Sequence, residues 1–281
     1  MANTETRKKN FTRRSRSIPR KLLRQGALHL VPLYYLLRLS DLGREGIEHS
    51  GSFRFADHIY RGTPSGRTRV GRWIDARLLA MPAAQAFRRR HEHAQAAVRL
   101  ALESCPAGTR PLRVLAVPCG IPRDMIDLAG RLRSENPALL SRIEYHGLDI
   151  DHQALAVASR STAQCGLVSP HYHLGDALNH DDYPRLKFQV VTSTGLGEFL
   201  RDDELAEFYA CVYDVMESGA TFYTSATARD WRSDVFLEMA ELVTIYRGHG
   251  ELERILRGLP WTRLVLSHDP SGLQTFVTAV K

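Results

Sequence analysis

The chain has 281 residues, of which 43% are hydrophobic and 8% aromatic, so it is long enough for one medium-sized globular domain with an appended segment. Its four cysteines include no C-x-x-C pair and have no neighbouring His cluster at zinc spacing. This excludes a disulfide framework, predicts no metal site and leads us to expect a reducing, cytoplasmic location. The formal charge of +7 is uneven, because residues 1–110 hold 22 Lys and Arg against 8 Asp and Glu, whereas residues 111–281 hold 16 against 23.

The chain is predicted to begin with a basic tail that leads into a helix. Residues 1–20 contain seven Lys and Arg and few apolar side chains, a composition typical of a flexible tail. The apolar spacing over 21–38 predicts an amphipathic helix, with a kink or a restart at Pro32. The apolar run 28–39 is too short and too interrupted to cross a bilayer, so we expect no membrane span.

The segment that follows is predicted to remain mainly helical. A Gly- and charge-rich stretch at 40–71 shows no clear periodicity, and a helical pattern resumes over about 73–103, with a break at Pro82. We therefore expect a helical domain at 21–105 and a second domain at 106–281, joined by a linker rich in turn residues.

The second domain alternates short apolar runs with helical patterns. Strands are expected at 112–117, 143–148, 171–174, 188–193, 220–225, 263–268 and 275–280. Helices are expected at about 123–134, 151–164, 202–217 and 232–257. This alternation predicts an α/β fold with a mostly parallel sheet between two layers of helices, while the last two strands read as an antiparallel hairpin.

The turn after the first strand is a candidate cofactor loop. In a doubly wound sheet this turn lies at the carboxyl edge where ligands bind, and Gly120 allows the backbone to approach a ligand closely. The turn contains no G-x-G-x-x-G motif and no phosphate-binding Lys, so neither a dinucleotide nor a nucleoside triphosphate is favoured. An ordinary strand-to-helix turn is the alternative.

Two further acidic positions follow the second and third strands. Asp149 comes about 30 residues after the glycine turn, where a ribose diol could donate to its carboxylate. Asp151 could instead be the N-cap of the next helix, since Asp is a favoured cap. Asp176 could accept a hydrogen bond from an exocyclic amine such as that of adenine, or could be a turn residue.

Four segments together resemble the ordered motifs of the class I S-adenosylmethionine-dependent methyltransferases: V-L-A-V-P-C-G-I-P-R-D, G-L-D-I-D, G-D-A and F-Q-V-V-T-S-T-G-L-G-E-F-L. The resemblance covers about residues 110–281 and implies a Rossmann-like, seven-stranded sheet that ends in an antiparallel hairpin. The chain departs from the family pattern at Val117-Pro118, where an acidic residue is usual, and at Pro122, where a second glycine is usual.

The resemblance also implies a set of residues that contact S-adenosylmethionine. These residues are Pro118, Cys119, Gly120, Arg123, Asp124, Asp149, Ile150, Asp151, Gly175, Asp176, Ala177, Ser193, Thr194 and Gly195. Asp149 is expected at the ribose hydroxyls, and Asp176 with Ala177 at the adenine. The fourth-strand segment is expected to border both the cofactor and the substrate.

Methyl transfer requires few catalytic groups, because the cofactor supplies the reactive methyl. Glu198 at the edge of the fourth strand, His58 and Tyr60 in the helical segment, and His249 are candidates for the residue that removes a proton from the acceptor. His58 and Tyr60 could instead pack within their own segment.

The acceptor is expected to be a small or lipid-like, anionic metabolite that is methylated at oxygen or nitrogen. In this family the segment before the first strand commonly forms a cap over the substrate pocket, and here that segment is basic. One alternative is an RNA methyltransferase in which basic residues at 7–24 and 88–90 contact phosphates. Two further alternatives are a cofactor-binding partner protein without catalysis and an enzyme that transfers the aminocarboxypropyl group.

Overall fold

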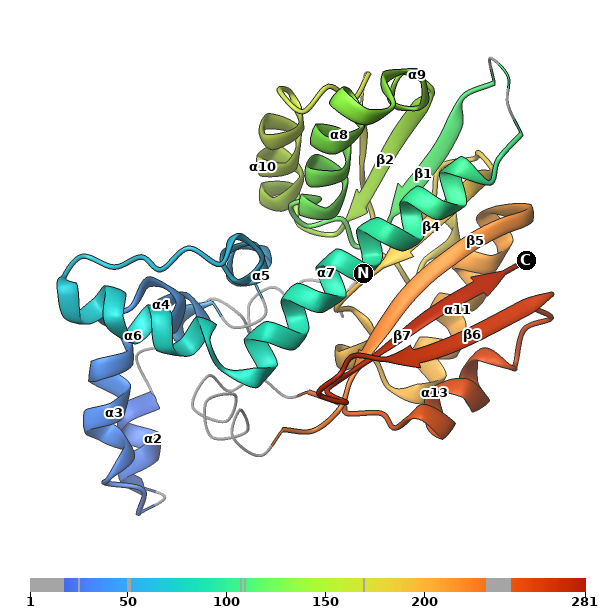
Figure 1. Cartoon of the computed structure of the whole chain (residues 1–281). Helices are drawn as coiled ribbons and strands as arrows, with labels where there is room; N and C mark the ends of the chain where they lie inside the picture. Colours follow the sequence, from blue (N-terminus) through green and yellow to red (C-terminus); the bar gives the residue numbers. More distant parts are fainter. Residues whose placement is uncertain are drawn as a thin grey trace. The chain divides into compact units, whose positions relative to one another are not determined.

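A computed structural model describes residues 18–24, 26–49, 52–106, 108, 110–168, 170–230 and 244–281. These residues form two compact units, one that runs to Arg88 and includes residues 229 and 230, and one that contains Arg89–Ala228 and Thr244–Lys281. The boundary falls inside one helix, so the last two thirds of this helix belong to the unit that holds the sheet (Figure 1). The expected tail at 1–20 lies outside the described residues, apart from its last three.

The first unit is helical, as predicted. Its helices are α2 (Ile18–Arg24), α3 (Leu30–Leu37), α4 (Asp41–Glu48), α5 (Phe53–Arg61), α6 (Arg69–Leu79) and the start of α7 (Pro82–Glu103). The helix restarts close to Pro32, as one of the two alternatives predicts, and Pro32 lies in the first turn of α3, where its missing N–H is tolerated. The chain turns at Gly26, whose φ is +73°.

Helices α4 and α5 lie in the Gly- and charge-rich stretch at 40–71, for which the sequence predicts no individual helix. Each begins at a serine whose hydroxyl accepts a backbone N–H of the first turn, Ser40 from Gly43 at 2.9 Å and Ser52 from Phe55 at 3.1 Å. Helix α5 ends at Gly62, which adopts the left-handed conformation with φ +62°. These local caps define two short helices within the Gly- and charge-rich stretch.

The second unit contains the seven-stranded sheet. Its strands are β1 (Leu112–Ala116), β2 (Ile143–Asp149), β3 (His171–Leu174), β4 (Phe188–Ser193), β5 (Met216–Thr227), β6 (Arg263–His268) and β7 (Gln274–Val280). The order in the sheet is β3-β2-β1-β4-β5-β7-β6. Neighbouring strands are parallel from β3 to β5, and β7 is antiparallel to both β5 and β6. The predicted fold class is therefore confirmed.

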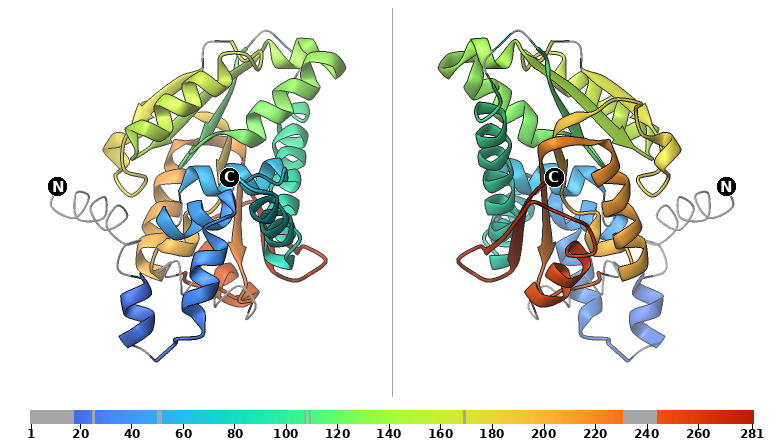
Figure 2. Two further views of the ribbon diagram at one scale, coloured as in Figure 1. Left: turned by 90° about the vertical axis from the view of Figure 1, so that its left-hand side faces the viewer. Right: turned by 90° about the vertical axis from the view of Figure 1, so that its right-hand side faces the viewer.

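Helices cover both faces of this sheet (Figure 2). They are α8 (Arg123–Glu135), α9 (Pro137–Leu140), α10 (His152–Thr162), α11 (Asp202–Val215) and α13 (His249–Leu256), with short 3-10 turns η1 (His180–Asp182) and η2 (Gly197–Phe199). The helix predicted at 232–257 is wrong over 244–248, where the chain is irregular, and its part from 232 to 243 lies outside the described residues. Helix α13 begins only after Gly248, whose N–H donates to Glu251.

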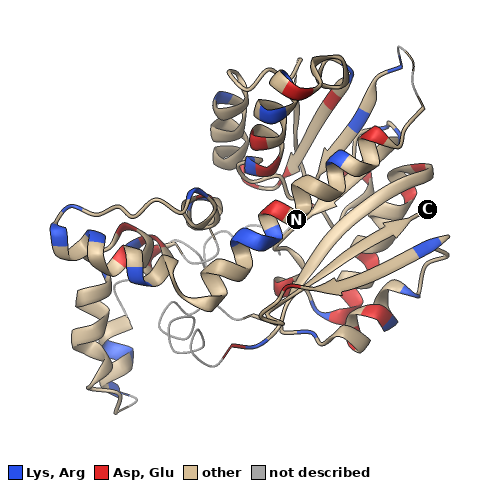
Figure 3. Ribbon diagram, in the orientation of Figure 1, with Lys and Arg blue, Asp and Glu red and all other residues tan. Residues whose placement is uncertain are grey.

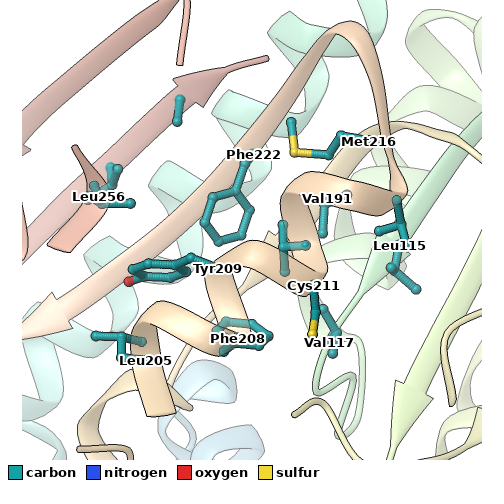
Figure 4. Packing of buried hydrophobic residues seen from close by; sticks show 14 of the residues in the cluster. Leu115, Val117, Val191, Leu205, Phe208, Tyr209, Cys211, Met216, Phe222 and Leu256 are labelled. Atoms are coloured by element: carbon teal, nitrogen blue, oxygen red, sulfur yellow. The ribbon is translucent and has the colours of Figure 1, made fainter. Parts of the chain in front are cut away.

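Two apolar clusters hold the layers together. On one face, α7 and α8 pack against β1, β2 and β4; on the other, α11 and α13 pack against β1, β4, β5 and β7 through buried residues that include Phe208, Tyr209 and Phe222 (Figure 4). Each such side chain contributes about 1.5–3 kcal/mol when it leaves water. The sheet edge that these clusters fix is therefore a rigid frame for a site.

Charge differs between the two units. Lys and Arg outnumber Asp and Glu on the helices of the first unit, whereas acidic residues gather on α11 and α13 of the second (Figure 3). Among the helices that the structure describes, none combines the length and the apolar character that a bilayer crossing requires.

Strand β2 approaches the turn after β1 so closely that only glycine fits at position 147. A Cβ placed there would lie 2.9 Å from the Cys119 sulfur and 3.1 Å from a ring carbon of Tyr172. We expect Gly147→Ala to lower the free energy of unfolding by about 1–3 kcal/mol, because both neighbours are packed. Denaturant titration would measure the change.

Gly130→Ala is the matched control for this prediction. Gly130 is exposed on α8, and nothing lies within 4 Å of the Cβ it would gain. Alanine there is expected to stabilise the chain by roughly 0.5–1 kcal/mol, because it favours the helical backbone. Equal effects of the two substitutions would show that Gly147 is not a packing requirement.

Candidate functional site

The turn after β1 is tied directly to the end of β2. The Gly120 N–H donates to Asp149 Oδ2 at 2.9 Å, and the Cys119 N–H donates to the Leu148 carbonyl at the same distance. Gly120 adopts φ +48°, a conformation that favours glycine. The structure therefore brings the predicted loop and the predicted carboxylate into contact.

The Asp149 carboxylate is buried at this junction. Its Oδ1 accepts the Asp151 N–H at 2.9 Å, so each oxygen already holds one backbone donor. The two oxygens of a carboxylate offer about four acceptor positions, so Asp149 keeps the capacity to accept from a hydroxyl of a ligand. Burial raises the pKa of Asp149, although the N–H groups of Asp151 and Gly120 oppose this rise.

Asp151 has the capping role that the sequence left open. Its carboxylate accepts the Gln153 N–H at 2.9 Å at the N-terminus of α10. This bond satisfies one of the free donors of the first helical turn. Its predicted contact with a cofactor, like that of Ile150, stays a prediction.

The predicted residues Gly175, Asp176 and Ala177, which follow β3, lie at the same edge of the sheet as the end of β2. The Gly175 N–H donates to the Asp149 carbonyl at 3.1 Å, and Asp176 Oδ1 accepts the Leu178 N–H at 3.0 Å in a turn. The Ala177 carbonyl accepts the Tyr183 hydroxyl at 2.8 Å. Asp176 is thus both a turn residue and a neighbour of the β2 edge, so the two alternatives stated for it are compatible.

Glu198 lies beyond the end of β4 and is buried, with 5% of its surface exposed. Its Oε1 accepts the Thr227 hydroxyl at 2.7 Å and lies 3.3 Å from the Arg90 guanidinium. Its Oε2 has no hydrogen-bond partner among the described residues and lies 3.8 Å from the Cβ position of Gly195. One acceptor of this carboxylate therefore remains available beside the predicted Ser193–Gly195 segment.

Arg90 is a site residue that the sequence analysis does not assign to this edge. It comes from α7 and is 2% exposed, and it pairs with a carboxylate 108 residues later in the chain. The sequence places it among basic residues for phosphate contact, which a buried guanidinium cannot make from this position. The only signal in the sequence is its place on the apolar side of α7.

Arg247 holds the segment around Glu198 in shape. Its guanidinium donates to the carbonyls of Gly197 and Leu200 and to the carboxylate of Asp202. Arg247 is itself buried, with 4% of its surface exposed. This clamp fixes η2, and with it the position of Glu198.

The chain matches the family model described as "Putative methyltransferase" over residues 38–252. It belongs to this methyltransferase family. The match confirms the resemblance to class I S-adenosylmethionine-dependent enzymes that the four motifs indicate. No curated protein matches the chain with statistical significance.

Solved structures share the fold of this chain at low sequence identity. A possible exported protein from Bordetella parapertussis has 21% identity and a TM-score of 0.75 over 99% of this chain and 96% of that one. The CMeT domain of the citrinin polyketide synthase has 13% identity and a TM-score of 0.61, over 93% of this chain and 68% of that one. The magnesium protoporphyrin IX methyltransferase of Synechocystis PCC 6803, with bound S-adenosylhomocysteine, has 15% identity and a TM-score of 0.51, over 80% of this chain and 93% of that one.

The other catalytic candidates lie elsewhere in the chain. His58 and Tyr60 are on α5 in the first unit, where His58 Nε2 contacts the buried carboxylate of Asp75 at 2.8 Å. His249 begins α13 and pairs with His268 at 3.2 Å on the exposed surface. Their catalytic roles stay predictions.

Three of the predicted cofactor residues, Cys119, Arg123 and Asp124, lie at or just before the start of α8. Cys119 is buried, and burial raises the pKa of its thiol, as it raises the pKa of the Asp124 carboxyl. Arg123 is half-buried in the first turn of α8. A thiol with a raised pKa is a weak nucleophile, so Cys119 is suited to packing beneath the loop.

The raised pKa of Asp149 predicts a pH dependence of cofactor binding. The ribose hydroxyls would donate to the deprotonated carboxylate of Asp149. Because the pKa of Asp149 is raised in the free protein, this carboxyl stays protonated up to a higher pH than an ordinary Asp does. We expect the affinity for S-adenosylhomocysteine to fall as the pH is lowered, and this fall to begin at a higher pH than an Asp with an ordinary pKa would give. Calorimetry at several pH values would measure it, and an affinity that falls as pH rises would contradict the assignment.

Proposed function

We propose that the chain is an S-adenosylmethionine-dependent methyltransferase whose cofactor lies along the carboxyl edges of β1, β2, β3 and β4. The observation that carries the proposal is the junction of the Gly120 N–H with the Asp149 carboxylate at 2.9 Å, in a chain that belongs to a methyltransferase family. The cofactor would supply a methyl group from its sulfonium. The protein has to bind it, orient the acceptor and exclude water.

The donors and acceptors at this edge fit the cofactor. Asp149 would accept from the ribose hydroxyls with the acceptor capacity that its backbone donors leave, and Asp176 would accept from the adenine amine. The buried Glu198 Oε2 and Ser225 Oγ have no hydrogen-bond partner among the described residues, although both lie near the carboxyl ends of β4 and β5. A polar ligand at this edge would satisfy atoms that the protein leaves without partners.

Glu198 would act on the acceptor. Its unpartnered Oε2 would accept the proton of a hydroxyl or amine, while Arg90 and Thr227 hold its other oxygen in place. We propose a small or lipid-like metabolite, anionic in character, methylated at oxygen or nitrogen. The buried position of Arg90 supports a small acceptor over RNA, because it removes one of the three arginines at 88–90 from phosphate contact.

Separate measurements of binding and turnover test this proposal. Calorimetry with S-adenosylhomocysteine is expected to show one binding site. When the protein is incubated with S-adenosylmethionine and small-molecule fractions of an extract, S-adenosylhomocysteine is expected to form as the product. Glu198→Gln is expected to keep cofactor affinity and to lose most turnover, since Gln cannot accept a proton at neutral pH. Absence of cofactor binding, or turnover with purified RNA alone, would overturn the proposal.

A further inference from the structure

Three histidines and a glutamate gather on the outer strands of the sheet. Glu144 and His146 alternate along β2, and His171 and His173 alternate along β3. The strands pair in parallel with His146 directly opposite His171, so all four side chains project from the same face. This histidine face, which we define by these four residues, has no part in the proposed methyl transfer.

The polar atoms of the histidine face converge. His146 Nε2 lies 3.0 Å from Glu144 Oε1, and ligand atoms of Glu144, His146 and His171 all lie within 4.8 Å of one another. Tetrahedral Zn²⁺ bound at about 2.0–2.1 Å separates its ligand atoms by roughly 3.3 Å. The 3.0 Å pair already approaches this separation, and a change in the rotamer of the exposed His171 would have to move its ring nitrogen by up to roughly 1.5 Å.

We propose that Glu144, His146 and His171 form a binding site for Zn²⁺, with a fourth position open to water. Two imidazoles and a carboxylate are ligands that zinc prefers. His146 Nδ1 lies 3.1 Å from His173 Nε2, so His173 fixes the orientation of the buried His146 ring in the manner of an outer-shell partner. The ion replaces the proton that now lies between His146 Nε2 and Glu144.

The site is distinct from the proposed cofactor site. Glu144 and Asp149 are five residues apart on β2, about 17 Å, and their side chains point to opposite faces of the sheet. Strand β3 is an edge strand of four residues. A metal that bridges β2 and β3 would hold this edge in place, so we assign it a structural role.

Electrostatics set the expected affinity. The Arg113 guanidinium lies 3.1 Å from Glu144 Oε2, where it orients the carboxylate and also repels a second cation. We therefore expect a dissociation constant on the order of 1 μM, weaker than that of a structural site with four protein ligands.

Metal titration of the tag-free full chain tests the site. After treatment with a chelator, the protein is expected to bind one equivalent of Co²⁺ with the intense visible absorption of a tetrahedral complex, and Zn²⁺ is expected to displace it. His171→Ala and Glu144→Gln should each weaken binding at least about 10-fold, the smallest effect typical of metal-site partners. Bound Zn²⁺ should raise the Tm of the wild type, because only the folded chain holds the site.

His249→Ala and His180→Ala are the controls. His249 belongs to a second histidine pair with His268, and His180 is an exposed histidine on η1, so both report binding at other histidines. Neither substitution should change the stoichiometry or the affinity. Wild-type binding by His171→Ala, no binding by the wild type, or a loss caused by His249→Ala would each overturn the proposal. His171 is exposed, so its removal should leave the fold intact.

Discussion

Asp149→Asn is expected to weaken the binding of S-adenosylhomocysteine by about 100-fold, the largest effect of any single substitution at the cofactor edge. The charged carboxylate would accept two ribose hydroxyls, and hydrogen bonds to a charged group contribute about 1.5–3 kcal/mol each. A loss of about 3 kcal/mol corresponds to that change in affinity. Calorimetry with purified wild type and variant would measure it.

Asp151→Asn is the matched control. The residue lies two positions away on the same edge and caps α10 through a bond that Asn forms equally well. Its substitution should leave the affinity within about 3-fold of wild type, since only the cap would be rebuilt. If Asp151→Asn weakened binding as much as Asp149→Asn, the ribose contact would have to be reassigned.

Arg90→Met is expected to lower the free energy of unfolding of the second unit by about 3–5 kcal/mol. The substitution would leave the Glu198 carboxylate buried, at 5% exposure, without its cationic partner. Removal of one partner of a buried pair is costly because the other charge stays desolvated. Denaturant unfolding followed by the fluorescence of Trp261, in the second unit, would report the change.

Two further variants separate the charge from packing. The double variant Arg90→Met with Glu198→Gln should be more stable than Arg90→Met alone, because it removes the unpaired charge. Arg99 lies on the same helix as Arg90 but forms an exposed ion pair with Glu103. We therefore expect Arg99→Met to change the free energy of unfolding far less. A double variant less stable than Arg90→Met would show that the pair is not the source of the loss.

The sheet and its order could be predicted from the sequence because each strand is a short apolar run between turn residues. Strands at 171–174, 188–193 and 263–268 occur at the predicted positions. The regular alternation of strands and helices then restricts the topology to a parallel sheet with crossovers. The capped helices α4 and α5 escape such analysis, since each turns only about twice and buries few side chains.

Contacts between distant segments could not be predicted. The pairing of Arg90 with Glu198 depends on how α7 packs against the sheet, which no local pattern encodes. The histidine face has no sequence signature for a related reason: metal-ligand spacing is recognisable only for residues close along the chain, whereas Glu144 and His171 meet only through strand pairing. By contrast, Gly120 and Asp149 could be placed at one edge, because parallel strands end on the same side.

The bond between the Gly120 N–H and Asp149 makes one backbone amide a reporter of the whole site. The hydrogen bond to the carboxylate must break before the amide hydrogen can exchange with solvent. The exchange rate therefore measures how often the loop separates from β2. A ligand that engages the same carboxylate and covers the loop would slow that exchange. Hydrogen-deuterium exchange at this amide would therefore follow occupancy of the edge without any knowledge of the methyl acceptor.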